Sequence, residues 1–216
     1  MIITGAFLSE GGKEFIIYDE ERQKYVISVA DAKKTGLYKL CENEDNLPYE
    51  AGAEESENIA FLARKMSCVK YALYLIEFSD KSRKTLLTKL KAKGYEKEVC
   101  DAALEVLESN KVVDDERLCA KKLQRIAETK FYGRYRIKNE LIKAGFSPET
   151  VENAFEEAEI DFDELIEKLA EKLLKGKKIK STPEYAKFVS KLQRYGYSYE
   201  NIKRTLDNYI DFEEEY

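Results

Sequence analysis

Histidine is absent from this sequence of 216 residues, and its four cysteines are scattered. The absence of histidine removes the commonest general base and the Ser-His and Cys-His nucleophile pairs. Cys41, Cys68, Cys100 and Cys119 show no Cys-x2-Cys spacing, so neither a zinc site nor a disulfide framework is expected. We expect Cys100, which occupies the repeat position of Val151 and Ile202, to be a small buried residue. We expect no metal and no cofactor, and any catalysis would depend on carboxylates, lysine or tyrosine.

Long hydrophobic runs are missing as well. No apolar stretch approaches the roughly 18 to 20 residues of a membrane-spanning helix. The first residues, Met1 to Gly5, lack the basic region of a secretory signal. These absences predict a cytoplasmic protein without membrane contact, while 44% hydrophobic residues suffice for packed cores.

A Leu-x3-Gly-aromatic signature occurs three times at a period of 51 residues, and the positions after it also align without gaps. The aligned positions are Leu90, Gly94, Tyr95, Cys100, Ala103 and Leu104, then Leu141, Gly145, Phe146, Val151, Ala154 and Phe155, then Leu192, Gly196, Tyr197, Ile202, Thr205 and Leu206. Such a period indicates a repeat protein, whose units bury their apolar faces against neighbours and build extended binding surfaces.

The net charge of −5 conceals an alternation of sign along the chain. Residues 1–60 carry 6 basic and 13 acidic side chains, and residues 61–146 carry 20 and 12. Residues 147–171 carry 1 basic and 10 acidic side chains, and residues 172–216 carry 10 basic and 7 acidic ones. A partner with a mixed surface, such as protein wrapped around nucleic acid, fits this alternation better than bare DNA does.

The N-terminal part favours strands. Residues 2–8, 14–18 and 24–29 are β-branched and aromatic and are separated by turn sequences, which predicts a three-stranded meander over residues 1–40. Asp31 could cap a short helix after it. Residues 41–57 are acidic and contain Pro48 and Gly52, so we interpret them as a solvated linker.

From Ile59 onward, apolar residues recur at helical spacing. We predict a mainly α protein, with three tandem three-helix repeats at 58–110, 111–160 and 161–216 in a curved array. Ser79 or Asp80 is a candidate cap of the second helix in the first repeat, and Ser147 of the third helix in the second repeat. The repeat glycines are expected to end helices in the left-handed conformation.

One acidic cluster, Asp114-Asp115-Glu116, allows two interpretations. The carboxylates could bind metal for phosphoryl chemistry. Alternatively they begin a helix, where acidic side chains accept backbone N–H bonds and complement the macrodipole. We favour the helix cap, because the sequence offers no second carboxylate cluster to complete a metal site.

The second helix of each repeat is rich in cations, and in the second repeat they alternate with aromatics from Phe131 onward. Arginine and lysine bind carboxylates and phosphates, and aromatic faces stack on bases. A solvated helix face explains the same charges. The candidate partner-binding residues are Arg83, Lys84, Lys89, Lys91, Arg134, Arg136, Lys138, Lys187, Lys191 and Arg194.

Three segments together resemble the RecX family of regulatory proteins. The segment 113–120, VDDERLCA, is similar to the family's Asp-Asp-x-Arg-Phe-Ala helix start. The segment 133–141, GRYRIKNEL, is similar to Gly-x-x-Arg-Ile-x-x-Glu-Leu, and 82–94, SRKTLLTKLKAKG, to Ser-x-x-Glu-Leu-x-x-Lys-Leu-x-x-Lys-Gly. Leu118, Cys119 and Thr85 depart from these patterns.

The resemblance implies tandem three-helix repeats and a partner, the bacterial recombinase RecA as its filament on single-stranded DNA. It implies a non-enzymatic monomer that limits filament extension, ATP hydrolysis, strand exchange and co-protease activity, with weak direct DNA binding. The alternatives are a stand-alone helical nucleic-acid-binding protein and, more remotely, a carboxylate-dependent nuclease.

Overall fold

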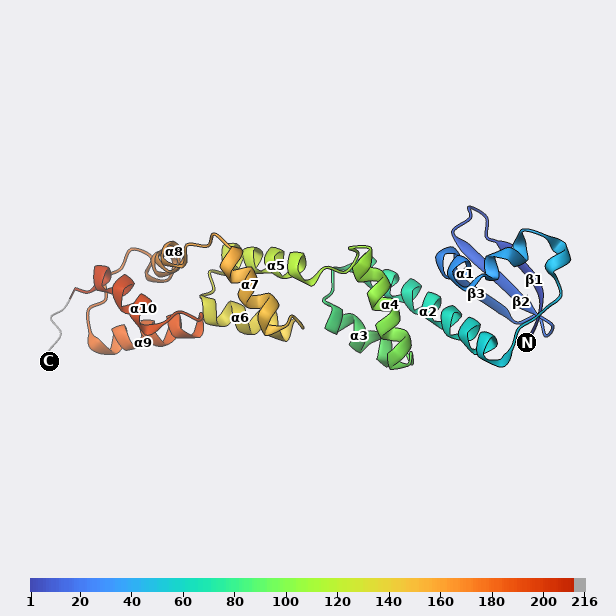
Figure 1. Cartoon of the computed structure of the whole chain (residues 1–216). Coiled ribbons are helices and arrows are strands. Elements are labelled where there is room, and N and C mark those ends of the chain that lie inside the picture. Colours follow the sequence, from blue (N-terminus) through green and yellow to red (C-terminus); the bar gives the residue numbers. More distant parts are fainter. Residues whose placement is uncertain (212–216) are drawn as a thin grey trace. The chain divides into compact units, whose positions relative to one another are not determined.

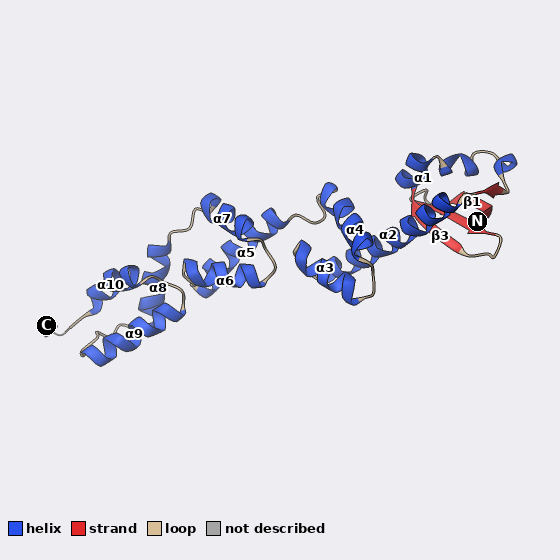
Figure 2. Ribbon diagram, turned by 60° about the horizontal axis from the view of Figure 1, so that its bottom comes forward, coloured by secondary structure: helices blue, strands red, loops and turns tan. Residues whose placement is uncertain are grey.

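The computed structural model describes residues 1–211 of the chain (Figure 1). The chain divides into two compact units, Met1–Val113 and Asp114–Tyr216. Within residues 1–211, the strands lie only in the first unit, as the red segments of Figure 2 show. Residues 212–216, at the acidic end of the expected third repeat, lie outside the described residues.

The first unit opens with an antiparallel sheet in the order β3-β2-β1-β4. Its strands are β1 (Ile2–Leu8), β2 (Glu14–Asp19), β3 (Lys24–Ser28) and β4 (Tyr49–Glu50). The first three form the expected meander, since β1 pairs with β2 and β2 with β3. Helix α1 (Val29–Thr35) follows, and Ser28, rather than Asp31, caps it by accepting a hydrogen bond from the Asp31 N–H.

Residues 41–57 are not the solvated linker that their acidity suggested. Tyr49–Glu50 adds a fourth strand by pairing with β1, and Ala51 is only 4% exposed. Helix α2 (Ala53–Phe78) begins within this segment and supplies Ile59 and Leu62 to the core of the sheet. Acidic side chains can remain solvated while their backbone forms a strand or a helix. Composition alone therefore does not distinguish a linker from a folded segment with a solvated face.

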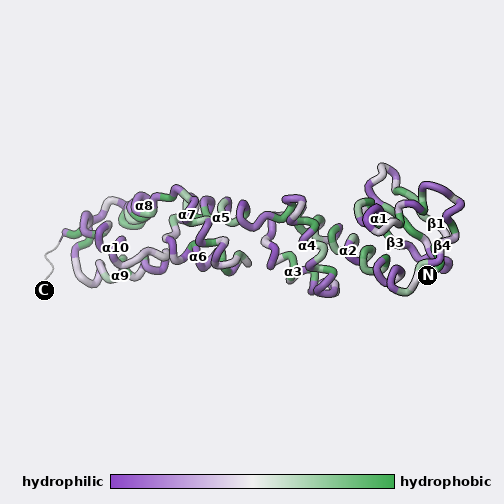
Figure 3. The backbone as a smooth tube through the Cα atoms, in the orientation of Figure 1, coloured by the Kyte–Doolittle hydropathy of each residue, from purple (hydrophilic) through white to green (hydrophobic). Residues whose placement is uncertain are grey.

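Nine helices within residues 53–206 form the expected groups of three (Figure 1). They are α2 (Ala53–Phe78), α3 (Arg83–Ala92) and α4 (Lys97–Ser109); α5 (Asp115–Lys130), α6 (Arg134–Lys143) and α7 (Pro148–Glu157); and α8 (Phe162–Leu174), α9 (Thr182–Arg194) and α10 (Tyr199–Leu206). The first helix of each group packs on the third. Each group has its own hydrophobic core, and hydrophobic and hydrophilic residues alternate along the helices (Figure 3).

Helix ends follow local sequence signals in most cases. Asp114 caps α5 and Ser147 caps α7, each through a side-chain oxygen that accepts a backbone N–H. Ser82 caps α3, in place of the expected Ser79 or Asp80. Gly94, Gly145 and Gly196 all have positive φ, between 93° and 101°, which confirms the left-handed helix ends.

Candidate partner-binding site

Helix α3 presents three lysines to solvent. It buries Leu86 and Leu90 in the core of the first repeat, which leaves Lys84, Lys89 and Lys91 on exposed positions. Within the described residues, none of these three amines takes part in an ion pair. They are therefore available to an acidic partner.

Arg83, at the start of the same helix, is engaged within the repeat. Its Nε lies 2.9 Å from Glu108 Oε1, and its Nη2 lies 3.5 Å from Asp101 Oδ1. Both acids are on α4, so this arginine ties the second helix of the repeat to the third.

The same tie recurs in the second repeat. Arg134 and Glu152 occupy the repeat positions of Arg83 and Asp101, and Arg134 Nη2 lies 3.5 Å from Glu152 Oε2. Lys138 bonds the other oxygen of the same carboxylate. These bonds, with that from Lys138 the strongest, lower the pKa of Glu152 from its ordinary value. The sequence could have indicated this ion pair, because the alignment at a period of 51 residues places an arginine and an acid at the same two positions in both repeats.

Arg136 joins two repeats. Its guanidinium carbon lies 3.9 Å from the centroid of the Tyr132 ring, and its Nη1 donates a hydrogen bond of 2.8 Å to the Arg194 carbonyl. The Tyr132 ring meets Tyr195 edge-on at 5.8 Å. Arg136 is therefore part of the junction between the second and third repeats, rather than of a solvent-facing row of cations.

The backbone completes this junction. The Gly133 N–H donates to the Tyr195 carbonyl at 2.8 Å, and the Tyr135 N–H donates to the Gly196 carbonyl at 3.2 Å. The start of α6 thus meets the end of α9. At this contact, N–H groups that have no partner within α6 bond carbonyls that have no partner within α9. The positive end of one helix dipole also lies next to the negative end of the other. The Tyr197 hydroxyl donates to the Phe131 carbonyl at 3.0 Å, and burial raises the pKa of Tyr197.

Helix α9 carries the remaining candidates. Lys187 and Arg194 are exposed and Lys191 is half-buried. The Arg194 Nε donates to the Ser190 carbonyl within the helix at 3.2 Å. The two lysines, like those of α3, form no ion pair with another described residue.

A cleft of about 500 Å³ brings two of the candidates together in the second unit. Arg134 and Lys138 line it from α6, beside Tyr135, which is 65% exposed. The remaining lining residues are Phe162, Gly196, Tyr197, Ser198, Glu200 and Asn201. Tyr135 is not among the candidate residues predicted from the sequence, although it lies between two of them, Arg134 and Arg136.

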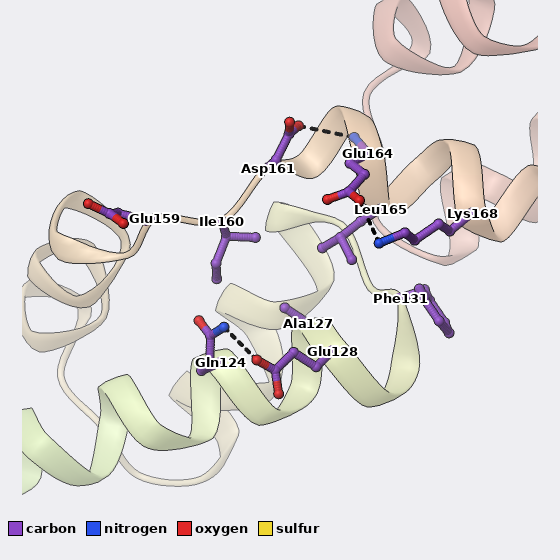
Figure 4. A pocket seen from close by; sticks show the side chains of 10 residues that line it. All are labelled: Gln124, Ala127, Glu128, Phe131, Glu159, Ile160, Asp161, Glu164, Leu165 and Lys168. Atoms are coloured by element: carbon purple, nitrogen blue, oxygen red, sulfur yellow. Dashed lines mark hydrogen bonds and ion pairs between the residues drawn. The ribbon is translucent and has the colours of Figure 1, made fainter.

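A second cleft, of about 390 Å³, lies between the C-terminal half of α5 and the segment that enters α8 (Figure 4). Its lining is Gln124, Ala127, Glu128, Phe131, Glu159, Ile160, Asp161, Glu164, Leu165 and Lys168. Glu128 accepts a hydrogen bond from Gln124, and Glu164 pairs with Lys168 at 2.6 Å. Asp161 caps α8 by accepting the N–H groups of Asp163 and Glu164.

These acids do not form a metal centre. Across residues 1–211, no three or more Asp, Glu, Cys or His side chains are arranged to hold a metal ion. The Asp114 carboxylate is occupied as a helix cap by the Arg117 N–H at 3.0 Å, as the cap interpretation predicted.

Cys68 and Cys119 are also poor nucleophiles. Cys68, Cys100 and Cys119 are buried, which confirms the prediction for Cys100. Burial raises the pKa of the Cys68 thiol to about 12 and that of Cys119 to about 11. The reactive thiolate is therefore scarce at neutral pH for these two cysteines.

Comparison with known proteins decides the family. The family model "RecX, first three-helix domain" matches residues 68–107, which span the C-terminal part of α2, α3 and nearly all of α4. The regulatory protein RecX of Vibrio vulnificus is 36% identical over 148 residues, covering 68% of this chain and 96% of that protein. The chain belongs to the RecX family. The RecX of Vibrio parahaemolyticus is 35% identical over 144 residues, covering 67% of this chain and 92% of its own.

Solved RecX structures share the fold. A crystal structure of regulatory protein RecX superposes with a TM-score of 0.74 at 16% identity, covering 96% of this chain and 100% of that one. The crystal structure of RecX from Lactobacillus salivarius gives a TM-score of 0.60 at 20% identity, covering 67% of this chain and 96% of that one. The mainly helical repeat fold with an N-terminal sheet, predicted from the sequence, is confirmed. None of the helices that the structure describes is long and apolar enough to cross a bilayer.

Proposed function

We propose that this protein is a non-enzymatic modulator of a bacterial RecA recombinase. It acts as a cytoplasmic monomer that binds the RecA filament on single-stranded DNA and limits filament extension, ATP hydrolysis, strand exchange and co-protease activity. The observation that carries the proposal is the relationship to regulatory RecX proteins, which extends over 96% of the length of one of them.

The lysines of α3 and α9, of which only Lys191 is half-buried, support binding surfaces for such a filament. A nucleoprotein filament offers phosphates and acidic side chains, both of which attract lysine amines. Lys89 and Lys191 occupy the same repeat position, 102 residues apart, so the two helices present an amine at equivalent points. Lys84, Lys91 and Lys187 extend these two surfaces.

The other cations contribute less in this proposal, because the fold already engages them. Arg83, Arg134 and Lys138 pair with acids of their own repeats, and Arg136 bonds the Arg194 carbonyl. A partner would have to compete with these contacts. Arg194 keeps most of its donor groups for a partner.

The test is the single-stranded-DNA-dependent ATPase of RecA from the same organism. We expect inhibition by the purified protein, and neither ATPase nor nuclease activity of its own. Inhibition far below one molecule per RecA, strongest during filament assembly, would indicate a block of growing ends. Inhibition that saturates near equal amounts would indicate coating of the filament. Undiminished ATP hydrolysis at an excess of the protein and low salt would refute the proposed function.

Charge-reversal variants test the surface separately. The triple variant Lys84→Glu, Lys89→Glu, Lys91→Glu should inhibit RecA much less than the wild type does. A matched control, Lys13→Glu, Lys24→Glu, Lys34→Glu, makes the same charge change at exposed lysines of the N-terminal domain and should inhibit normally. Equal loss in both triples would mean that overall charge, rather than the α3 surface, controls binding.

A further inference from the structure

A row of aromatic side chains lies along the C-terminal half of α2. Tyr71, Tyr74 and Phe78 are spaced by three and four residues, so they share one face of the helix. The Tyr71 and Tyr74 rings are stacked with centroids 6.1 Å apart, and Tyr74 and Phe78 meet edge-to-face at 4.9 Å. Tyr95, from the loop after α3, meets Tyr71 at 6.3 Å.

The outer part of this row is largely exposed to solvent. Tyr74 is 53% exposed and Phe78 is 71% exposed, although both are large and aromatic. The core of the first repeat takes Cys68 and Ala72 from α2 instead. Contiguous exposed apolar surface of this kind marks an interaction site in soluble proteins.

The charge around the row indicates the kind of partner. Residues 61–93 carry nine lysines and arginines against two acids. The Lys93 amine lies 5.4 Å from the centroid of the Tyr71 ring, which places a cation directly beside the aromatic row. A polyanion with flat apolar groups matches this combination of charges and rings.

Another exposed aromatic pair provides a contrast. Phe7, 45% exposed, stacks on Tyr18 at 5.8 Å on the N-terminal sheet. That pair lies in residues 1–60, which carry 13 acids and 6 basic residues. Its surroundings repel a polyanion, so exposed aromatic rings coincide with positive charge at α2 but not at the sheet.

We propose that the C-terminal half of α2 is a stacking platform for single-stranded nucleic acid. Bases stack on the exposed parts of the Tyr74 and Phe78 rings, whose centroids lie 4.9 Å apart, and Lys93 attracts the adjoining phosphates. Duplex bases are already stacked on one another, so the platform prefers single strands, with little sequence preference because every base has a flat face. This site requires no RecA and is separate from the lysines of α3 and α9.

The chain lacks tryptophan, which permits a specific reporter. In the otherwise unchanged full-length protein, the Phe78→Trp variant places one indole on the platform. Titration with an oligothymidylate at low salt should quench its fluorescence, because the base stacks on the indole. An abasic strand of the same length, which keeps the phosphates but offers no bases, should quench it far less. Equal or absent quenching by the two strands would overturn the proposal.

Affinity measurements give an independent test. The variant Tyr74→Ala, Phe78→Ala should bind labelled oligothymidylate about tenfold or more weakly in anisotropy titrations without RecA. Tyr74→Phe should retain binding, since it keeps the ring. Tyr199→Ala, at a 57% exposed tyrosine of α10, is the matched control and should bind normally. Circular dichroism melts verify that the exposed substitutions leave the fold intact.

The outcomes separate this proposal from the proposed function. If the double alanine variant binds the oligonucleotide like the wild type but no longer inhibits RecA, the α2 row contacts protein, and the platform is refuted while RecA modulation stands. If it loses oligonucleotide binding yet still inhibits RecA, the platform is supported and shown to be independent of filament inhibition.

Discussion

Gly133 and Gly196 approach each other so closely that neither position has room for a side chain. A Cβ atom on Gly133 would lie 2.4 Å from the Gly196 carbonyl oxygen, and one on Gly196 would lie 2.5 Å from the Arg136 Cβ atom. Real Cβ atoms do not come this close to backbone, so a substitution must push α6 away from the end of α9. The two glycines thus fix the contact between the second and third repeats.

We therefore predict that Gly133→Ala lowers the free energy of unfolding by about 1–3 kcal/mol through overpacking. Gly196→Ala adds the strain of its φ of 93° to the clash. Gly94→Ala is the matched control, because Gly94 holds the same repeat position with a φ of 101° and open space around it. In urea titrations, Gly196→Ala should cost more than Gly94→Ala, and equal costs would contradict the close approach.

The second prediction isolates the left-handed helix end. Gly145 has a φ of 97°, and a β-branched side chain is strained there. Gly145→Val should lower stability by roughly 1–3 kcal/mol. Gly145→Asn should cost less, because asparagine tolerates this conformation best among residues with side chains. A thermal melt of Gly145→Val that matches the wild type would argue against this role.

The sequence was sufficient to predict these helix ends, because their signals are local. A glycine after an apolar helix, Asp114 before α5 and Ser147-Pro148 at the start of α7 each act on backbone groups within a few residues. The period of 51 residues then extended the same assignment to all three repeats. Such features need no knowledge of the tertiary structure.

Contacts between distant segments could not be predicted in this way. Arg136 bonds a carbonyl 58 residues away, and β4 pairs with a strand nearly 50 residues before it. Ile59 and Leu62 follow the helical pattern of the first repeat, yet they pack in the core of the sheet. A pattern reveals which residues are buried, but not against what. The linker interpretation is therefore wrong, and the contact of Arg136 with the third repeat is not predicted from the sequence.

The third prediction concerns pH. The contacts from Lys138 and Arg134 lower the pKa of Glu152 below its ordinary 4.5. Because the folded-state pKa is the lower one, the ion pairs stabilise the fold fully above pH 4.5 and are lost as the pH falls through the folded-state pKa. Glu152→Gln should therefore be less stable than the wild type near pH 7, and the two should converge in acid. The effect will be small, because these pairs are exposed.

Nuclear magnetic resonance can test the cause directly. The Glu152 carboxyl group should titrate at higher pH in Lys138→Gln than in the wild type, and a similar but smaller change is expected in Arg134→Gln. An unchanged Glu152 titration in both variants would show that neither cation contacts this carboxylate in solution.

The final prediction concerns which parts of the chain fold independently. If residues 41–57 were the linker between two domains, as the sequence predicts, a chain that begins near Glu55 would fold stably. In the structure, however, that truncation removes the sheet against which Ile59 and Leu62 are buried, at 0% and 7% exposure. Burying one such side chain is worth about 1.5–3 kcal/mol. We expect the truncated chain to melt earlier than the whole protein and to bind a hydrophobic dye.

A cut at the boundary between the two compact units should behave differently. The fragment 114–216 contains the complete cores of the second and third repeats and the whole Gly133–Gly196 junction. It should therefore unfold cooperatively by circular dichroism, without dye binding, and Gly133→Ala should destabilise it as it does the full chain. If the fragment is unfolded while the chain from Glu55 is stable, the first repeat is needed to complete the second, and the assignment of units is wrong.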